Sequence, residues 1–213
     1  MNYPINLKLS NRRCLVVGGG RVAERKVLKL IRAGAKVTII SPILTEKLHK
    51  LVSDGKIKWI ADNYKKNAAK GFFIVIAATN DEDANNEAIS DARSCGAIIN
   101  APSNPAESDF FVPAVLRRGD LTVTISTEGA SPAFARVMKE ELAKFLPENL
   151  SEWLVRLRKI REELKNTIDG SKNREFFWKK GLNADVLRLL RDGKLNDAEV
   201  ELRNGFSRDR FKS

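Results

Sequence analysis

Three consecutive glycines, Gly18 to Gly20, constrain this chain more than any other feature of its sequence. They follow an apolar run, Cys14 to Val17, and precede a segment, Val22 to Ala33, whose apolar residues recur at helical spacing. With Ala23 they fit the pattern G-x-G-x-x-A, in which the first glycine permits a tight turn and the second lets a ligand come close to the backbone. The segment therefore predicts a strand, turn and helix that bind a dinucleotide pyrophosphate at the helix N-terminus. A purely structural glycine turn is the alternative interpretation.

Strand and helix patterns alternate through the first hundred residues. The predicted strands after the glycines lie at Val37 to Ile40, near Ile57 to Ile60, at Phe72 to Ala77 and at Ala97 to Asn100. Helical patterns between them span Thr45 to Ser53 and Asp83 to Cys95. This alternation predicts an α/β fold, a Rossmann-type doubly wound parallel sheet with right-handed crossovers.

The alternation ends at a loop, Ala101 to Asp109, which contains two prolines. A helical or turn segment is expected from Phe110 to Arg118, then an alternating strand from Leu121 to Ser126, and then a helix from Pro132 to about Phe145. From Glu148 onward the pattern is helical. We expect a Rossmann domain over residues 1–112, a small α+β region over 113–146 and a helical C-terminal domain over 147–213.

The net charge of +11 arises entirely in the N-terminal third of the chain. Residues 1–70 contain 16 Lys and Arg against 4 Asp and Glu, and the remainder contains 22 against 23. Such a surplus favours an anionic partner. Because the cations alternate with apolar residues and only 7% of the residues are aromatic, the sequence favours a small polyanionic ligand over nucleic acid.

Several classes of protein are disfavoured by simple absences in the sequence. No apolar run approaches the ~20 residues of a membrane span, and the N-terminus has no signal-peptide pattern, so we expect a cytoplasmic chain without a membrane partner. The two cysteines, Cys14 and Cys95, and the single histidine, His49, do not stand at metal-ligand spacing. No metal site is predicted, and His49 is expected to be a solvated surface residue.

The cofactor preference is not fixed by the residues alone. An acidic residue about 20 positions after the glycines usually binds the adenosine ribose, but Ser41 stands there, followed by Pro42. A serine neither forbids nor favours a 2′-phosphate, so these residues do not distinguish NAD from NADP as the cofactor. Ala78 and Thr79, small residues at the end of the run 72–77, would let the backbone pass close to the cofactor.

Three motifs in order resemble one family, the N-terminal region of siroheme synthases. They are Val16 to Lys26 (VVGGGRVAERK), Ile76 to Asp81 (IAATND) with Asn85, and Ser126 to Pro132 (STEGASP) with Ala135 and Arg136. The resemblance implies a precorrin-2 dehydrogenase, which in some members is also a sirohydrochlorin ferrochelatase. It implies NAD as cofactor, oxidation of precorrin-2 to sirohydrochlorin in siroheme (porphyrin-type) biosynthesis, a central dimerisation region and a homodimer. Precorrin-2 carries eight carboxylates, which is consistent with the basic surplus.

The resemblance also implies functional positions. For the cofactor these are Arg21, Val22, Pro42 and Ile43, beside Gly18, Gly20, Ser41, Ala78 and Thr79 from the motif itself. Ser126, Thr127, Ser131 and Arg136 would bind the tetrapyrrole, although Ser131 is equally well explained as the N-cap of its helix.

The segment Asn100 to Pro105 departs from the family pattern. Many members carry an aspartate, assigned to catalysis, where this chain has Ser103. A serine is neither a carboxylate base nor a strong iron ligand, which makes chelation doubtful while hydride transfer can survive. Asp109 is the candidate proton acceptor, with an N-cap before Phe110 as the alternative. Glu128 is a second departure, because an anion stands in a segment usually rich in glycine.

Two further interpretations follow. A non-catalytic NAD-sensing or tetrapyrrole-binding module is the rival function, because Ser103 removes the carboxylate.

The alternating strand 121–126 exposes one apolar face, and a lone strand and helix bury too little surface to be stable. Pairing with a second copy around a twofold axis is therefore expected.

Overall fold

The computed structural model describes residues 2–210, and it describes side chains as far as residue 204. The chain forms two compact units, Asn2–Val112 and the part that begins at Pro113. The three-part division of the chain at residues 112 and 146 stays a prediction.

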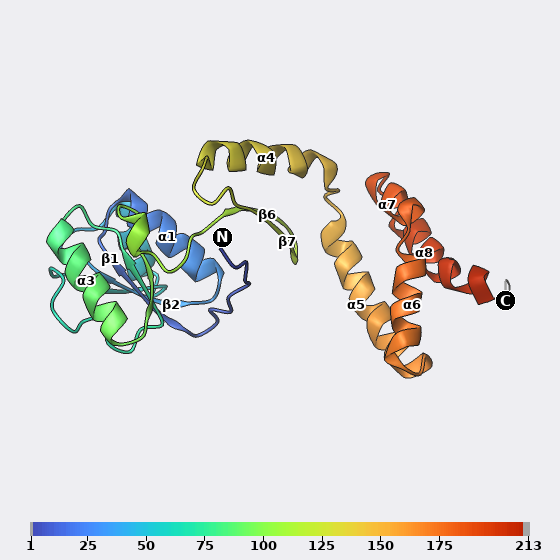
Figure 1. Ribbon diagram of the computed structural model, residues 1–213, viewed down its shortest axis with the longest axis horizontal. Coiled ribbons are helices and arrows are strands. Elements are labelled where there is room, and N and C mark those ends of the chain that lie inside the picture. The colour runs from blue at the N-terminus through green and yellow to red at the C-terminus, as the bar shows by residue number, and fades with distance from the viewer. Residues whose placement is uncertain (1, 211–213) are drawn as a thin grey trace. The chain divides into compact units, whose positions relative to one another are not determined.

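The first unit is built on a five-stranded parallel sheet (Figure 1). Its strands are β1 (Arg13–Val17), β2 (Lys36–Ile40), β3 (Lys58–Ile60), β4 (Ile74–Ala77) and β5 (Ile98–Asn100). The order across the sheet is β3-β2-β1-β4-β5, so the chain reverses its direction of winding between β1 and β4. The predicted Rossmann-type doubly wound sheet is confirmed, and its switch point lies where the glycines follow β1.

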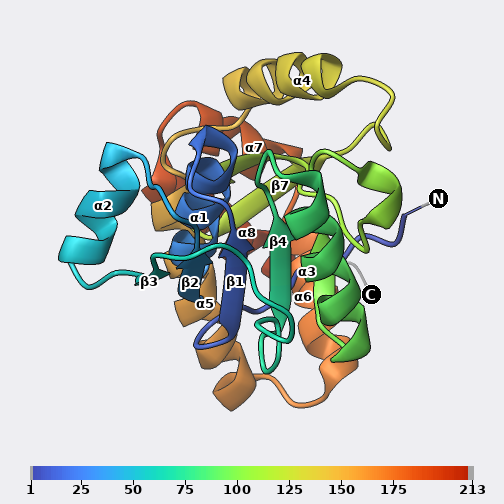
Figure 2. The ribbon, with the colours of Figure 1, turned by 90° about the vertical axis from the view of Figure 1, so that its left-hand side faces the viewer.

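Helices cover both faces of this sheet (Figure 2). They are α1 (Arg21–Arg32), α2 (Glu46–Ser53) and α3 (Glu82–Ser94), with a short 3₁₀ turn at Pro105–Glu107. Alternate residues of each strand point to opposite faces. Thus Val16 packs with Val27 of α1 in one apolar cluster, whereas Leu15 packs with Ala88 of α3 in another. The central strands β1 and β4 are almost fully buried because both of their faces are covered.

Three cations of the basic N-terminal third begin strands. Arg13, Lys36 and Lys58 are the first residues of β1, β2 and β3, and Arg12 and Arg13 lie over the rings of Phe73 and Phe72. In a parallel sheet these positions lie at the amino end, opposite the carboxyl end where ligands bind. A part of the charge surplus therefore does not face the ligand-binding end.

The second unit begins with a two-stranded antiparallel hairpin, β6 (Ala114–Arg118) and β7 (Leu121–Ile125), followed by α4 (Pro132–Phe145). The expectation of a helical or turn segment up to Arg118 is wrong, and the strand 121–126 is not alone. Gly119, with a φ of +57°, and Asp120 form a tight turn that pairs the two strands. The hairpin is a local pairing across a two-residue turn, and the periodicity of residues 110–118 alone does not show it.

The remainder of the second unit is helical, as expected. Its helices are α5 (Leu150–Thr167), α6 (Ser171–Gly181), α7 (Ala184–Arg191) and α8 (Leu195–Arg210). They enclose an apolar cluster that includes Trp153, Phe177 and Leu202.

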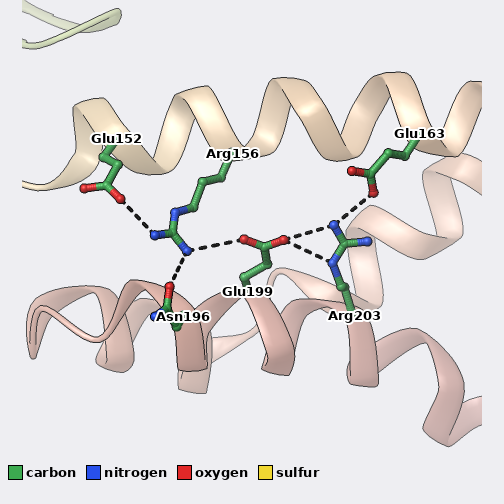
Figure 3. Close-up of polar contacts among 6 residues, drawn as sticks. All are labelled: Glu152, Arg156, Glu163, Asn196, Glu199 and Arg203. Atoms are coloured by element: carbon green, nitrogen blue, oxygen red, sulfur yellow. Dashed lines mark hydrogen bonds and ion pairs between the residues drawn. The ribbon is translucent and has the colours of Figure 1, made fainter.

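A line of charged side chains joins α5 to α8 (Figure 3). Arg156 on α5 donates to Glu152 at 2.8 Å and to Asn196 of α8 at 2.8 Å, and it pairs with Glu199. Arg203 pairs with Glu199 on its own helix and with Glu163 of α5. These contacts fix the register of the two helices. They lie at or near the surface, where solvent screens ion pairs, so each contributes little to stability.

Candidate functional site

The first glycine makes the turn after β1. Gly18 has a φ of +109°, its N–H donates to the carbonyl of Ile40 at 2.9 Å, and a Cβ there would lie 2.4 Å from the carbonyl oxygen of Ala78. Such a conformation is routine only for glycine. Gly18 therefore lets the ends of β1, β2 and β4 approach one another closely.

The middle glycine has a role that the sequence did not indicate. A Cβ at Gly19 would lie 1.9 Å from the carbonyl oxygen of Ile43, and the carbonyl of Gly19 accepts from the N–H of Thr45 at 3.0 Å. Gly19 is thus packed directly against the segment between β2 and α2. The one sequence signal for this packing role is that position 19, where the motif accepts any residue, is also a glycine.

The third glycine differs from both, because no protein atom requires it. Gly20 caps the N-terminus of α1 with an ordinary φ of −83°, and a Cβ there would meet nothing within 4 Å. The space above it lies at the positive end of α1, where backbone N–H groups bind phosphate. The open cradle fits a dinucleotide pyrophosphate.

A cavity of about 490 Å³ lies at the carboxyl ends of β1, β2 and β4. It is formed by four segments of the first unit. They are Val17 to Gly20, Ile40 to Thr45, Asp62 to Tyr64, and Ala78 to Asp81 together with Ala84. Seven of the nine predicted cofactor residues lie here, namely Gly18, Gly20, Ser41, Pro42, Ile43, Ala78 and Thr79. The other two, Arg21 and Val22, are exposed in the first turn of α1 and are not among the lining residues.

Buried polar groups hold the rim of the cavity. Asn85, which is buried, accepts from the N–H of Thr79 at 3.2 Å and donates to its carbonyl at 2.9 Å. The hydroxyl of Ser41 donates to the carbonyl of Ile43 at 2.8 Å. Both loops that face the cofactor are therefore fixed by side chains from the chain itself. Asn85 belongs to one of the quoted motifs, but nothing in the sequence shows that it clamps Thr79.

The segment after β3 that lines the cavity was not predicted from the sequence. Tyr64 lines it and donates from its hydroxyl to the buried carboxylate of Asp91 at 2.9 Å, and Asp91 also accepts from the backbone N–H of Asn67. Burial and the adjacent Asp91 raise the pKa of Tyr64 well above its usual range. The network holds the loop after β3 on α3.

The charged side chains that line the cavity are acidic. They are Asp62 and Asp81, and no described residue that lines it is Lys or Arg. A hydrogen bond from Lys65 lowers the pKa of Asp62, while Asp81 accepts from the N–H of Ala84 as the N-cap of α3. A 2′-phosphate would bring two more negative charges without a cationic partner in this cavity.

The catalytic candidates of the loop after β5 lie outside this cavity. Ser103 is exposed, and Asp109 accepts from the N–H of Ile99 through Oδ2 at 2.8 Å. The alternative of an N-cap before Phe110 is wrong, because β6 follows and Asp109 is bonded to the edge of β5. Glu107, the other carboxylate of this loop, pairs with Arg93 at 2.6 Å.

Three of the four predicted substrate residues gather in the turn before α4. The hydroxyl of Ser131 accepts from the N–H of Phe134 at 3.1 Å, so Ser131 is the N-cap of α4, and its own N–H donates to Thr127 Oγ1. Ser126 accepts from the N–H of Glu128. Arg136 is exposed one turn further along α4. Their binding role stays a prediction.

A doubly wound parallel sheet with an open glycine cradle at its switch point defines a dinucleotide-binding protein of the Rossmann type. The family model described as "Putative NAD(P)-binding" matches residues 5–114, and the model described as "Sirohaem biosynthesis protein central" matches residues 118–144. The chain belongs to this NAD(P)-binding family. The two matches in succession confirm the resemblance to the N-terminal region of siroheme synthases.

Sequence similarity to known proteins supports this assignment. The chain is 33% identical over 201 residues to a siroheme synthase of Psychrobacter sp. (strain PRwf-1), with 94% of this chain and 41% of the relative covered. It is 34% identical over 210 residues to a siroheme synthase of Mannheimia succiniciproducens, covering 98% of this chain and 44% of the relative. The chain thus spans less than half the length of these relatives.

Among solved structures, the chain matches "SirC, precorrin-2 dehydrogenase" with a TM-score of 0.77 and 22% identity, covering 95% of this chain and all of that one. At this identity the match supports the fold. Within residues 2–210, no helix is long and apolar enough to cross a bilayer.

Proposed function

We propose that the protein is an NAD-dependent dehydrogenase that oxidises precorrin-2 to sirohydrochlorin. The observation that carries the proposal is the cavity at the switch point, where Gly20 leaves an open cradle on the N-terminus of α1. The acidic lining favours NAD over NADP. The substrate follows from the relatives named above, which are siroheme synthases and a precorrin-2 dehydrogenase.

Apart from Asp109, the residues named for the site bind and orient the two reactants. The backbone N–H groups at the start of α1 hold the pyrophosphate, and Ser41 and Pro42 border the adenosine ribose at the end of β2. The clamp of Asn85 on Thr79 fixes the wall at the end of β4. Bound NAD supplies the hydride acceptor. Since hydride transfer depends mainly on the alignment of two bound molecules, a rigid cavity is the main contribution of the protein.

Asp109 is the proposed proton acceptor. One of its oxygens is held by the N–H of Ile99 while the side chain stays exposed to solvent. Ser103 lacks a carboxylate, so we propose that metal insertion is slow. With sirohydrochlorin and Fe²⁺ or Co²⁺, we expect little protein-dependent chelation by the wild type and faster chelation by Ser103→Asp. Chelation by the wild type at the rate of its own dehydrogenation would contradict this point.

We propose a homodimer formed through the region 113–146. Support comes from Phe134, Val137 and Phe145, which form an exposed apolar stripe on α4. A cytoplasmic location and the lack of a nucleic-acid or membrane partner stay predictions.

The test is a turnover assay. Mixing precorrin-2 and NAD⁺ with the protein should produce the absorbance of reduced cofactor in proportion to enzyme, and NADP⁺ should be used at least tenfold less efficiently. A non-catalytic NAD-sensing or tetrapyrrole-binding module, the rival function, would bind both molecules and produce no reduced cofactor. That result would refute the proposal.

A further inference from the structure

The side chain of Lys26 links α1 to the end of β5. Its Nζ donates to Oδ1 of Asn100 at 2.6 Å, and the amide nitrogen of Asn100 donates to the carbonyl of Phe110 at 3.0 Å. Asn100 is the last residue of β5 and is buried, with only 4% of its surface exposed. Lys26 is itself partly buried. The ammonium group is therefore held at the carboxyl edge of the sheet, unlike the cations that begin the strands.

Lys26 has no counter-charge among the described side chains. Its hydrogen-bond partner is a neutral amide, and no carboxylate of residues 2–204 pairs with it. Burial is the main cause that lowers the pKa of Lys26 to about 8, and repulsion from Lys29 and Arg25 on the same helix adds to it. Buried or partly buried cations are normally paired, because an unpaired charge loses solvation without gaining an attraction.

The carboxylates of α1 and of the loop after β5 are engaged elsewhere. Glu24 accepts from Thr45 at 2.7 Å and pairs with Lys47. In the loop after β5, Glu107 pairs with Arg93, and Asp109 accepts from Ile99. The chain thus presents a preorganised cation at this edge and does not neutralise it.

The position of Lys26 relates it to the nicotinamide half of the dinucleotide site. In this fold the adenosine ribose lies at the end of the second strand, so the nicotinamide half extends across the switch point toward β4 and β5. Asn100 is paired in register with Ile76, two residues before Ala78 of the cavity wall. Lys26 therefore flanks the side on which the hydride acceptor and the reduced substrate meet.

We propose that the ammonium group of Lys26 binds a carboxylate of the tetrapyrrole substrate and orients it at the nicotinamide side of the cavity. This proposal rests on the proposed function, because it takes precorrin-2 as the substrate. One of the eight carboxylates of precorrin-2 supplies the counter-charge that the protein lacks. Lys26 is a substrate-positioning residue and takes no part in bond changes.

The experiment compares wild type, Lys26→Met, Lys26→Arg and the matched control Lys29→Met, a neighbouring exposed lysine of the same helix. A charge-assisted hydrogen bond predicts that Lys26→Met loses about ten- to a hundredfold in kcat/KM for precorrin-2, mainly through KM. The dissociation constant of NAD⁺, measured by calorimetry, should stay within about twofold of the wild type. Lys26→Arg should keep most of the activity, and Lys29→Met should resemble the wild type.

The pH profile gives a readout that a structural role would not move. The binding form is the ammonium, so kcat/KM of the wild type should fall as the pH rises above about 8, the free-enzyme pKa of Lys26. This limb should be absent in Lys26→Met. In a ¹⁵N-lysine NMR titration, saturating sirohydrochlorin should raise the pKa of Lys26, since a carboxylate stabilises the charged form. This titration does not depend on turnover or on the folding of a variant.

The outcomes separate the two proposals. If the wild type forms no reduced cofactor from precorrin-2, the proposed function fails and the Lys26 proposal fails with it. If the wild type is active but Lys26→Met keeps its kcat/KM, or if sirohydrochlorin leaves the pKa of Lys26 unchanged, only the Lys26 proposal is overturned. A loss of NAD⁺ affinity in Lys26→Met, or a rate that rises through pH 8, would also overturn it, because Lys26 would then contact the cofactor or act as a base.

Discussion

The unit Asn2–Val112 and the region 113–146 differ in how much apolar surface one chain can bury. In the first, strands such as β1 and β4 are covered on both faces, and the cavity walls are fixed by backbone packing and buried amides. In the second, whose residues are all described, just Leu116 and Ala135 are buried hydrophobic residues, while α4 exposes its apolar stripe. We infer from this difference that the cofactor site is complete within one chain, and we propose that a second copy covers the central region.

The largest expected effect lies in the first unit, at Gly19. A Cβ there would lie 1.9 Å from the carbonyl oxygen of Ile43, and neither backbone segment can move without disrupting the cavity. Gly19→Ala should abolish NAD⁺ binding and destabilise the unit severely, by about 4 kcal/mol or more. Chemical denaturation and calorimetry would measure both. Wild-type stability in Gly19→Ala would show that the rigidity assigned to this unit is wrong.

The next effect concerns the exposed stripe of the central region. Replacing Phe134 and Val137 together by Asp should convert the proposed dimer to a monomer, because buried carboxylates would be left without partners. Light scattering should then give a mass near 23.8 kDa. Val200→Asp, on a similarly exposed apolar residue of α8, is the control and should remain a dimer. If the wild type is fully active as a monomer at micromolar concentration, the central region needs no second copy, and the inferred difference between the two regions is wrong.

A smaller effect is expected from the network under the loop after β3. Asp91→Ala would leave the hydroxyl of Tyr64 and the N–H of Asn67 without their acceptor. We expect a loss of about 2–3 kcal/mol in the free energy of unfolding and weaker NAD⁺ binding, since Tyr64 lines the cavity. An unchanged denaturation midpoint would show that solvent satisfies these groups and that the rim is less rigid than we infer.

The smallest effect belongs to the turn before α4. Glu128 has a φ of +50°, a left-handed conformation that glycine adopts at lower cost. Glu128→Gly should therefore stabilise the second unit by up to about 1 kcal/mol and leave NAD⁺ affinity unchanged. The family pattern, which favours small residues here, has a conformational reason. A loss of stability would instead show that contacts of the Glu128 side chain outweigh the strain.

Local patterns predicted the parts of the molecule that neighbouring residues determine. The strand before Gly18, the helix after Gly20 and the small residues after β4 follow from periodicity and from the glycine motif. Contacts between distant segments were not predictable in this way. Gly19 meets Ile43, Asn85 clamps Thr79, and Lys26 reaches Asn100, 74 positions away. The strand β6 was missed for a different reason, because its structure depends on its pairing with β7 across the adjacent two-residue turn.

Calorimetric titration of NAD⁺ into the full chain tests whether the cradle at Gly20 binds the cofactor. Gly20→Asp places a carboxylate where a Cβ meets no protein atom, so the variant should unfold at nearly the wild-type midpoint. It should nonetheless lose at least about a hundredfold in NAD⁺ affinity, because the side chain occupies the pyrophosphate position and repels it. A folded Gly20→Asp variant that binds NAD⁺ as tightly as the wild type would contradict the account.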